Sequence, residues 1–445
     1  MRNLALDSWE VVLPMLSRTL LSGLLFVLGL AVAAPTRAAA QTSALDSLQS
    51  QSTLDLGLLE RAVLERNPSL GAGRAAWRGG EAAADQAGGL DDPMLEIMTA
   101  PRSWSSSTVD PATMVALSQR LPLFGQRGLK ARAAHAEARA LGEDYRGARL
   151  DALREARRAF YEYFLAARGH TVNAEIKDLL GQVRRTAVAR YASGTAGIED
   201  ALRADVEIAM LDHEDVELTR EQRVAAARLN ALLQRDPGAP LPEPPGEITL
   251  PPAPARSDSL LALALGSRPE LKSWAAQRDS RAAELSLARR QRLPEFTLTA
   301  RYDRYWEVPE LRPSAGISLN LPIQFGRLGA AERAARAGVE QMEYRRKAAE
   351  AEIGAEVETA LAGVQETEHE IHIMRERVLP ATERALQAVR AGYESSRAGF
   401  EGLLNAERDL ARARFELYRA QVAYMQGLAD LSRAVGSGPA EEDTP

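Results

Sequence analysis

The segment Leu121-Pro122-Leu123-Phe124-Gly125 is followed, 200 residues further on, by the near copy Leu321-Pro322-Ile323-Gln324-Phe325-Gly326. A second pair of matching segments, 191–199 and 393–401, has an offset of 202. A nearly constant offset over the whole length is the signature of an internal duplication. The chain therefore consists of two copies of one structural unit.

This duplication sets the expected domain boundaries. We expect a first repeat over 41–235, a Pro-rich connection over 236–257, a second repeat over 258–436 and a short tail over 437–445. Eight prolines lie in the connection. Because proline lacks the amide hydrogen that a helix needs, no regular helix is expected there.

The composition narrows the range of functions. Of the 445 residues, 26% are charged, only 5% are aromatic and none is cysteine. Such a mixture is typical of long exposed helices rather than thick cores. The absence of cysteine excludes disulfides, Cys-type zinc sites and thiol catalysis. A net charge of −6 argues against a nucleic-acid partner, which would favour a basic surface.

Residues 1–40 are predicted to be an export signal. Arg18 precedes an apolar run, Leu20–Ala34, and small residues follow at Ala38-Ala39-Ala40. A basic flank, a short apolar core and small residues at the cleavage site define a secretory signal. The run is shorter than the roughly 20 residues of a membrane-spanning helix. We expect cleavage after Ala40, with Met15 as an alternative to Met1 as the start of translation.

Each repeat is predicted to contain one helix, two short strands, a very long helix, a glycine-containing turn and a returning helix. The first helices are expected at 54–87 and 259–292, and the long helical hairpins at about 128–234 and 328–436. Apolar residues spaced three and four apart indicate coiled-coil packing of the hairpins. The two shorter helices of each copy could stack end to end along the long one. The seam residues are Val172, Ile176, Leu180, Val183 and Ala187 in one copy, and Val357, Leu361, Val364, Ile371 and Met374 in the other.

Four strands are predicted, at about 94–101, 113–121, 295–303 and 313–321, with alternating apolar and polar residues. A half-buried soluble hairpin shows this alternation, and so does a membrane β-barrel with lipid outside and water inside. Eight strands is the smallest practical barrel. Four strands from one chain therefore require two or three chains to close a barrel.

Taken together, the export signal, the duplication, the strand pairs and the two helical hairpins resemble the TolC-type family of outer-membrane efflux ducts. The most specific matches are the Leu-Pro segments that begin at Leu121 and Leu321 and end in glycine, and the helix–turn segments at 190–197 and 392–399. The resemblance covers about residues 54–436. Segments 89–95 and 121–128 look most like the heavy-metal efflux branch of the family.

The resemblance implies a mainly α fold with a small membrane β part. Three copies would form one twelve-stranded β-barrel in outer-membrane lipid, and their helices an α-barrel tunnel that extends into the periplasm. The implied partners are a periplasmic adaptor and an inner-membrane pump of the resistance–nodulation–division type. Neither enzyme activity nor a cofactor is implied. The alternatives are a duct for drugs or other small organic molecules and, in a different class, a periplasmic coiled-coil scaffold or adaptor.

The resemblance also assigns roles to the helix–turn segments, whose tips would dock the adaptor and form the tunnel entrance. Well-known members narrow the entrance with aspartates at the positions of Gly402 and Asn405, so that ring is not reproduced. We hypothesise instead that Glu199 and Glu401 supply six carboxylates per trimer and favour cations. The alternative is that they are solvated charges at helix starts. The tip candidates are Arg190, Tyr191, Gly194, Thr195, Gly197, Ser395, Ser396, Arg397 and Gly399, and the entrance candidates are Glu199, Asp200, Arg203, Glu401 and Asn405.

No metal centre is predicted, although two groups of residues were considered. His369 and His372 lie three residues apart and could share a divalent ion, but exposed helix residues explain them equally well. Three methionines near the strands would suit Cu(I), although apolar filling is the simpler explanation. His213 aligns with Phe415 of the second copy and is predicted to pack in the helix seam. The methionines are Met94, Met98 and Met114.

Overall fold

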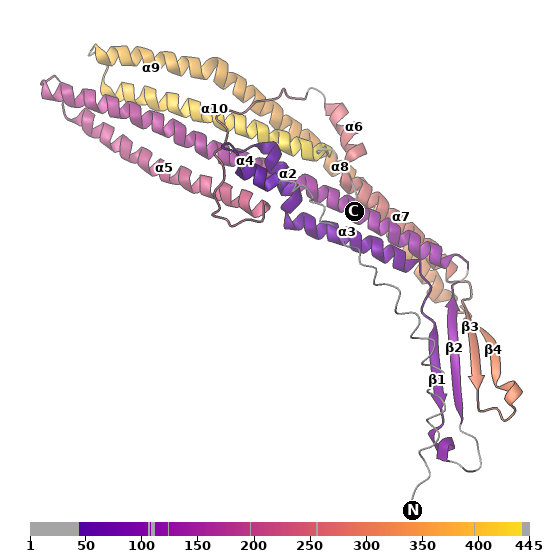
Figure 1. The fold of residues 1–445 in the computed structure, drawn as a ribbon. Coiled ribbons are helices and arrows are strands. Elements are labelled where there is room, and N and C mark those ends of the chain that lie inside the picture. The colour runs from indigo at the N-terminus through magenta and orange to yellow at the C-terminus, as the bar shows by residue number, and fades with distance from the viewer. Residues whose placement is uncertain are drawn as a thin grey trace, which may run out of the picture. The chain divides into compact units, whose positions relative to one another are not determined.

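The structure is a computed structural model that describes residues 44–105, 107, 112–122, 124–195, 197–254, 257–395 and 397–437. The predicted signal over 1–40, the tip residue Ser396 and most of the predicted tail lie outside these residues. The described part consists mainly of helices with one four-stranded antiparallel sheet (Figure 1). The predicted mainly α fold with a small antiparallel β part is confirmed.

The long helix of the first copy is α4, Gln126–Ala192, which has 67 residues. At about 1.5 Å per residue it is roughly 100 Å long. The helix begins directly after Gly125, whose φ of +70° lies in the left-handed region that glycine adopts without strain. The glycine of the repeated Leu-Pro segment therefore makes the turn from strand into helix.

In the second copy the corresponding helix is not regular throughout. Helix α8 spans Phe325–Ile373, a π-helical turn, η3, spans Met374–Val378, and α9 spans Leu379–Glu394. The expectation of one regular helix over 328–393 is wrong at this point. Pro380, at the start of α9, has no amide hydrogen for the preceding turn, and such positions commonly bend a helix or widen a turn.

The prediction of single helices over 54–87 and 259–292 is also wrong. The first is divided into α2, Leu56–Arg66, and α3, Pro68–Ala87; the second into α6, Ser257–Ser267, and α7, Pro269–Arg290. Both breaks fall on the residue before a proline, where ψ is 121° in Asn67 and in Arg268. The proline ring disfavours helical backbone in the preceding residue. The first helix therefore ends before that residue, and a second helix begins at the proline.

The shorter helices pack along the long ones. In the first copy α3 lies along the first half of α4, and α5, Glu199–Leu232, along its second half (Figure 1). In the second copy α6 and α7 pack on α8, while α10, Phe400–Val435, contacts α8, α9 and α4. The short helix α1, Ala44–Gln49, packs on α2. This arrangement confirms the predicted end-to-end stacking.

Apolar clusters hold the helices together. In the first copy, Phe160 and Phe164 of α4 are buried against the leucines of α1, α2 and α5. In the second copy, Val357, Leu361 and Val364 of α8 are buried against Tyr424 of α10. Burial of one such side chain stabilises the fold by about 1.5–3 kcal/mol. Most predicted seam residues lie in or against the second cluster or a third one near the helix turns, which contains Leu180. The buried seam residues are Val172, Leu180, Ala187, Val357, Leu361, Val364 and Ile371.

The sheet has the order β1-β2-β3-β4 with antiparallel neighbours throughout. The strands are β1, Met94–Thr99; β2, Thr113–Leu121; β3, Phe296–Asp303; and β4, Pro313–Leu319. Residues directly opposite one another share a face of the sheet. The register pairs Ile97 with Val115, Val115 with Tyr302, Leu117 with Ala300 and Leu298 with Ile317.

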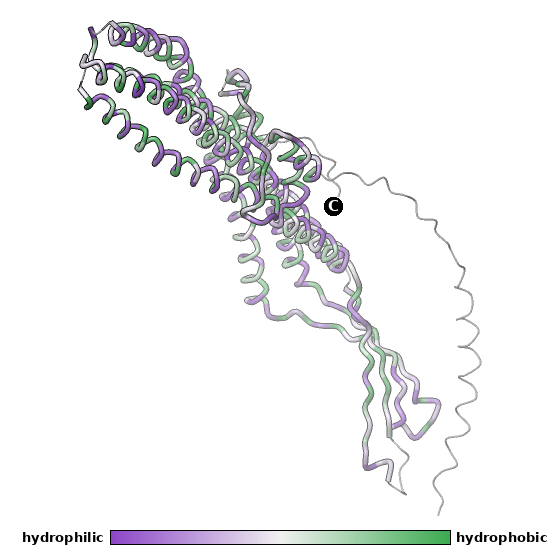
Figure 2. The backbone as a smooth tube through the Cα atoms, turned by 60° about the vertical axis from the view of Figure 1, so that its left-hand side comes forward, coloured by the Kyte–Doolittle hydropathy of each residue, from purple (hydrophilic) through white to green (hydrophobic). Residues whose placement is uncertain are grey.

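The predicted apolar residues of all four strands therefore form one continuous surface. It is uncovered in this chain: Leu95, Ile97 and Ile317 are 61%, 65% and 69% exposed. The opposite face carries polar residues from Glu96 on β1 to Ser318 on β4, together with Met94, Met98, Met114 and Ala116 of the first strand pair. Along the helices, Figure 2 shows hydrophilic and hydrophobic residues interleaved. Helix α5 also has large apolar side chains that are exposed, at Leu202, Val206, Met210 and Val216. Within the described residues, no helix combines the length and apolarity that crossing a membrane requires.

The Pro-rich connection is irregular but anchored. Over 236–254 its only regular feature is an isolated bridge between Thr53 and Glu243. The Tyr424 hydroxyl donates to the Pro251 carbonyl at 2.6 Å, and the buried Asn230 amide donates to the Ala239 carbonyl at 2.8 Å. The connection is thus fixed to the end of α5 and to the side of α10.

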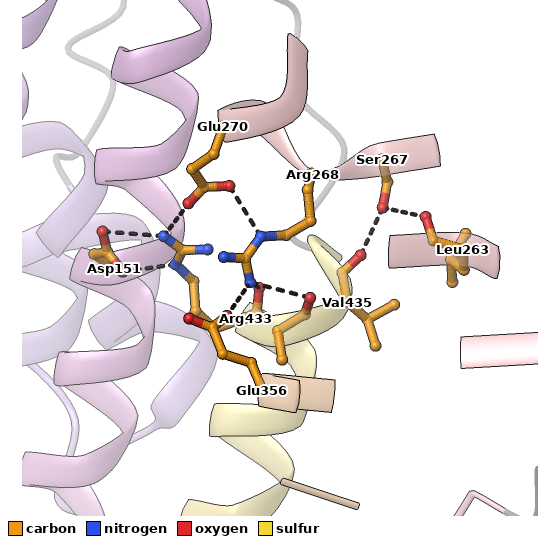
Figure 3. Close-up of polar contacts among 9 residues, drawn as sticks. Asp151, Leu263, Ser267, Arg268, Glu270, Glu356, Arg433 and Val435 are labelled. Atoms are coloured by element: carbon orange, nitrogen blue, oxygen red, sulfur yellow. Dashed lines mark hydrogen bonds and ion pairs between the residues drawn. The ribbon is translucent and has the colours of Figure 1, made fainter. Parts of the chain in front are cut away.

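A polar cluster joins the two copies where α6 meets α7 (Figure 3). The Arg268 guanidinium, whose side chain is 5% exposed, donates to Glu270 at 2.9 Å and to Glu356 at 2.8 Å. It also donates to the Ala434 carbonyl at 3.1 Å, at the end of α10. Arg433 bonds Glu270 as well and donates to Asp151 of α4 at 2.6 Å. The cluster therefore connects α4, α7, α8 and α10.

Candidate functional site

The turn between α4 and α5 closes through its own backbone. The Thr195 amide donates to the Arg190 carbonyl at 2.9 Å, and the Gly194 amide donates to the Tyr191 carbonyl at 2.9 Å. This pair of bonds, with Gly194 at φ +70°, is the Schellman motif that ends many helices. The hydroxyls of Ser193 and Thr195 also donate to the Arg190 carbonyl. Four of the predicted tip residues, Arg190, Tyr191, Gly194 and Thr195, therefore serve first to terminate a helix.

The turn between α9 and α10 repeats this pattern at an offset of 202 residues. The Arg397 amide donates to the Gly392 carbonyl at 2.7 Å, and the Ala398 amide to the same carbonyl at 3.0 Å. The Ser395 hydroxyl donates to the carbonyl of Ala391 at 2.8 Å and accepts from the Arg397 guanidinium at 3.0 Å. The duplication thus produces two turns of matching backbone hydrogen bonding.

The glycine that follows each turn has different surroundings in the two copies. A Cβ atom added at Gly197 would overlap the Glu199 carboxylate, which is the movable end of a long side chain. A Cβ atom added at Gly399 would meet nothing within 4 Å. Gly399 also has an extended backbone, φ −80° and ψ 160°, which any residue can adopt. The fold therefore tolerates a side chain at Gly399.

An aromatic contact joins the two turns. The Arg190 guanidinium carbon lies 4.9 Å from the centre of the Tyr393 ring, and Arg190 donates to the Tyr393 carbonyl at 3.4 Å. Cation–π contacts of this kind contribute about 0.5–2 kcal/mol. Tyr393 is 4% exposed and packs edge-on against Phe400, whereas its repeat counterpart Tyr191 is 51% exposed. The duplication predicted equivalent tyrosines; only the tertiary structure distinguishes the packed one from the exposed one.

The predicted entrance residues lie at the starts of α5 and α10. Glu199, Arg203, Glu401 and Asn405 are exposed and Asp200 is half-buried. Arg203 lies 3.7 Å from Glu401, so this pair links the two returning helices. Glu199 forms no ion pair with any described residue. The Glu401 carboxylate of the hypothesised ring is thus partly neutralised by Arg203 of the same chain.

Replacement Glu401→Gln tests this hypothesis. We expect a weaker cation preference in planar bilayers and a weaker block by divalent cations. The effect should be about fivefold at most, because two charges at contact distance in water interact by about 1 kcal/mol. The matched control is Glu221→Gln, an exposed change further along α5. Unchanged conductance and block in Glu401→Gln would show that Glu401 is a solvated helix-start charge.

The metal candidates gain no support from the described residues. His369 and His372 are both exposed, and no group of three possible protein ligands occurs in the described part of the chain. Met98 lies opposite Met114 in the sheet, while Met94 lies opposite Ser118. Only two of the three methionines are therefore directly paired.

The prediction that His213 packs in the helix seam is wrong. Its side chain is 74% exposed and lies 3.8 Å from Glu217, one turn further along α5. Its repeat counterpart Phe415 is half-buried and packs near Gly169. Helix α10 has neighbours on several sides, whereas α5 packs chiefly against α4. Equivalent positions consequently differ in burial.

Sequence inspection missed a buried carboxyl on α10. Glu407 is 3% exposed, and neither of its carboxylate oxygens has a hydrogen-bond partner in the described structure. Its counterpart in the first copy, Asp205, bonds Arg184 at 2.5 Å. At the position that corresponds to Arg184 the second copy has Leu386. Alignment of the repeats would have revealed this loss of a cation.

Burial raises the pKa of Glu407 to about 7, against an ordinary value of 4.5, although Arg390 lowers it slightly. The contribution of this carboxyl to stability is therefore fully present below about pH 4.5 and is lost as the pH rises through 7. We expect Glu407→Gln to match the unaltered protein at pH 5 and to exceed it at pH 8 by roughly 3 kcal/mol at most. Unfolding temperatures measured from pH 5 to 9 test this. The control Asp205→Asn should show no gain at high pH.

Comparison with known proteins was consistent with this geometry. The family profile described as outer membrane efflux protein matches residues 59–234 and 260–437, one match for each repeat. No protein among those with curated descriptions matched the sequence significantly.

Solved structures share the fold. The outer membrane protein VceC from Vibrio cholerae is 20% identical, with a TM-score of 0.72 over 86% of this chain and 96% of that chain. The open outer membrane channel MtrE from Neisseria gonorrhoeae is 20% identical, with a TM-score of 0.71 over 86% and 89%. CusC is 19% identical, with a TM-score of 0.73 over 87% and 93%. At these identities the likeness shows the fold alone. Since the profile matches both repeats over most of their length, the chain belongs to the outer membrane efflux protein family.

Proposed function

We propose that three copies of this chain form the outer-membrane duct of a tripartite efflux system, which conducts heavy-metal cations to the exterior. The observation that carries the proposal is the sheet. One of its faces is a largely apolar, uncovered surface, and the other carries most of the polar residues together with three methionines, which fits a barrel wall between lipid and water. Four strands per chain give twelve in a trimer, which exceeds the minimum for closure.

Aromatic residues near the loop end of the sheet support the membrane placement. Tyr302 ends the apolar row of β3, and Tyr305 and Trp306 follow in the loop; they are about half exposed. Tyr and Trp are enriched where a membrane surface meets water. The sheet therefore has an apolar band and an aromatic edge.

In this proposal the helices form a tunnel in the periplasm. The two turns at the far ends of the hairpins dock a periplasmic adaptor, and an inner-membrane pump of the resistance–nodulation–division type supplies the energy. The duct itself catalyses no reaction. The choice of heavy metals rests on the resemblance of segments 89–95 and 121–128 to that branch of the family.

Extraction of the native membrane protein tests the duct. We expect a trimer that stays in the outer-membrane fraction until detergent is added. Full solubility without detergent would favour the alternative class, a periplasmic scaffold.

Growth of a deletion strain tests the cargo. We expect selective sensitivity to copper, silver, zinc, cobalt or nickel, restored by the intact gene, with unchanged tolerance of detergents and antibiotics. Sensitivity to organic compounds alone would assign the protein to the organic-molecule ducts and contradict the choice of metals.

A further inference from the structure

Basic residues gather where helices α3, α4, α7 and α8 meet the sheet (Figure 1). The segments around these four junctions carry nine basic and four acidic residues, a net charge of +5; they are 88–93, 122–136, 286–295 and 320–336. The loop segments at the other end of the sheet, 100–112 and 303–312, carry three basic and four acidic residues, a net charge of −1. The helix end of the sheet is therefore positive in a chain whose net charge is −6.

These nine basic residues are termed the basic collar, and their charge is largely uncompensated. Among the described residues, only three members of the collar pair with a carboxylate. The other members form no ion pair with a described residue; they are Arg127, Lys130, Arg132, Arg290, Arg327 and Arg333.

The three paired members share a single carboxylate. Arg289 and Arg292 donate to Glu332 of α8 at 3.2 and 2.8 Å, and Arg336, one turn further along α8, donates to it at 3.2 Å. The Glu332 side chain is 17% exposed, whereas the three arginine side chains are between 53% and 56% exposed. Because one carboxylate neutralises one guanidinium, two positive charges remain in contact with solvent.

Exposed apolar side chains border the basic collar and continue the apolar face of the sheet. The ring of Phe124 is centred 6.5 Å from that of Phe296, which lies on the apolar face of β3. Phe124 is 48% exposed, and its carbonyl accepts a hydrogen bond from the Arg290 guanidinium. After β4 three more apolar residues are 64% to 76% exposed; they are Leu321, Ile323 and Phe325. Apolar surface and positive charge thus adjoin one another.

The spacing of these groups fits the surface of a bilayer. Phe325 precedes Glu332 by seven residues, which are two turns of α8, so both lie on the same helix face roughly 10 Å apart. Strand β2 has nine residues, and a strand that crosses a membrane needs about 9–11. If the sheet spans the hydrocarbon layer, the exposed apolar residues lie at its surface and the arginines at the level of the headgroups.

We propose that the basic collar binds anionic phospholipids. The guanidiniums contact the headgroup phosphates, with which arginine forms bidentate hydrogen bonds, and the apolar residues contact the upper part of the acyl chains. Both the charge of the collar and its continuity with the apolar face of the sheet favour such a lipid. A free phosphate would leave Phe124 and Ile323 uncovered. This inference rests on the proposed membrane placement of the sheet, but not on the cargo or the pump.

Electron spin resonance tests the collar with the full mature chain in phosphatidylcholine vesicles. The probes are spin-labelled phosphatidylglycerol and spin-labelled phosphatidylcholine. We expect an average preference of about threefold for phosphatidylglycerol, because one basic residue gives about fivefold at an anionic surface and only one leaflet touches the collar. Salt at about 1 M should remove most of the preference through screening. Millimolar inorganic phosphate should leave it unchanged.

Matched double variants assign the preference to the collar. Arg289→Gln with Arg292→Gln should lose at least half of it. Arg278→Gln with Arg281→Gln should retain it, although these two arginines are also three residues apart on the α7 segment and about half exposed. Lys130→Gln with Arg132→Gln breaks no ion pair between described residues, and it should lower the preference even if the first double variant folds poorly.

The possible failures are distinguishable. Equal association of the two lipids, or an equal preference in the collar and control variants, would overturn this proposal alone. Loss of the preference in inorganic phosphate would show a site for the free anion and would also overturn it. If no motionally restricted lipid of either kind were seen, the protein would not be inserted, and the proposed duct would fail together with the collar.

Discussion

Replacement of Arg268 by alanine should destabilise the protein by about 1.5–3 kcal/mol, the usual contribution of hydrogen bonds to a charged group, because the carboxylates of Glu270 and Glu356 that remain are 31% and 47% exposed. The guanidinium neutralises Glu270 and Glu356 and bonds the last carbonyls of α10, so its loss leaves four acceptors without their donor. The measurement is the unfolding temperature of the purified protein. Faster proteolysis at the end of α10 should accompany this loss of stability.

Arg278→Ala is the matched control on the same helix. Arg278 pairs with Asp279 and Glu343, and all three side chains are about half exposed. Surface pairs contribute about 0–1 kcal/mol, so this variant should unfold near the unaltered protein. Arg268→Lys keeps the charge but not the planar fork, and we expect an intermediate result. Equal unfolding temperatures for the two alanine variants would show that the Arg268 cluster does not support the fold.

The second large effect concerns function. Gly399→Trp should reduce export to the level of the deletion strain while the trimer still forms. The structure has open space at this position and a backbone that any residue adopts, so the side chain costs the fold little. In the proposed complex it projects into the surface that docks the adaptor. Growth under the selective compound and cross-linking of the trimer measure the two properties separately.

Gly246→Trp is the control, because Gly246 is exposed in the Pro-rich connection and also has no atom near an added Cβ. We expect normal export from it. Gly197→Trp is less informative, since its side chain must first displace the Glu199 carboxylate. Normal export by Gly399→Trp would remove this turn from the docking surface. Loss of the trimer would show that the glycine serves folding.

The local elements were largely predictable because they depend on neighbours in the sequence. The alternation Phe296, Leu298, Ala300 and Tyr302 predicted one face of β3, and the register confirms a shared apolar surface. In the first copy Gly125 of the Leu-Pro segment makes the transition from strand to helix, whereas its counterpart Gly326 lies inside α8. The helix breaks were missed, although Pro68 and Pro269 were visible; the apolar pattern continues through them and concealed the local constraint.

The candidate site was predictable only in part. The duplication indicated both helix turns, and the backbone bonds of Arg190 and Gly392 follow the same offset. It could not show that Tyr393 is buried while Tyr191 is exposed, or that Arg203 pairs with Glu401. These differences arise because α10 has neighbours that α5 lacks.

The sequence by itself determined the duplication, the order of helices and strands, the two faces of the sheet and the family. All of these depend on periodicity and on backbone preferences that act over a few residues. The tertiary structure alone decided the polar cluster around Arg268, the contact between Arg190 and Tyr393, and the burial of Glu407. These depend on which helix faces meet in space, and two copies of nearly the same sequence meet different neighbours.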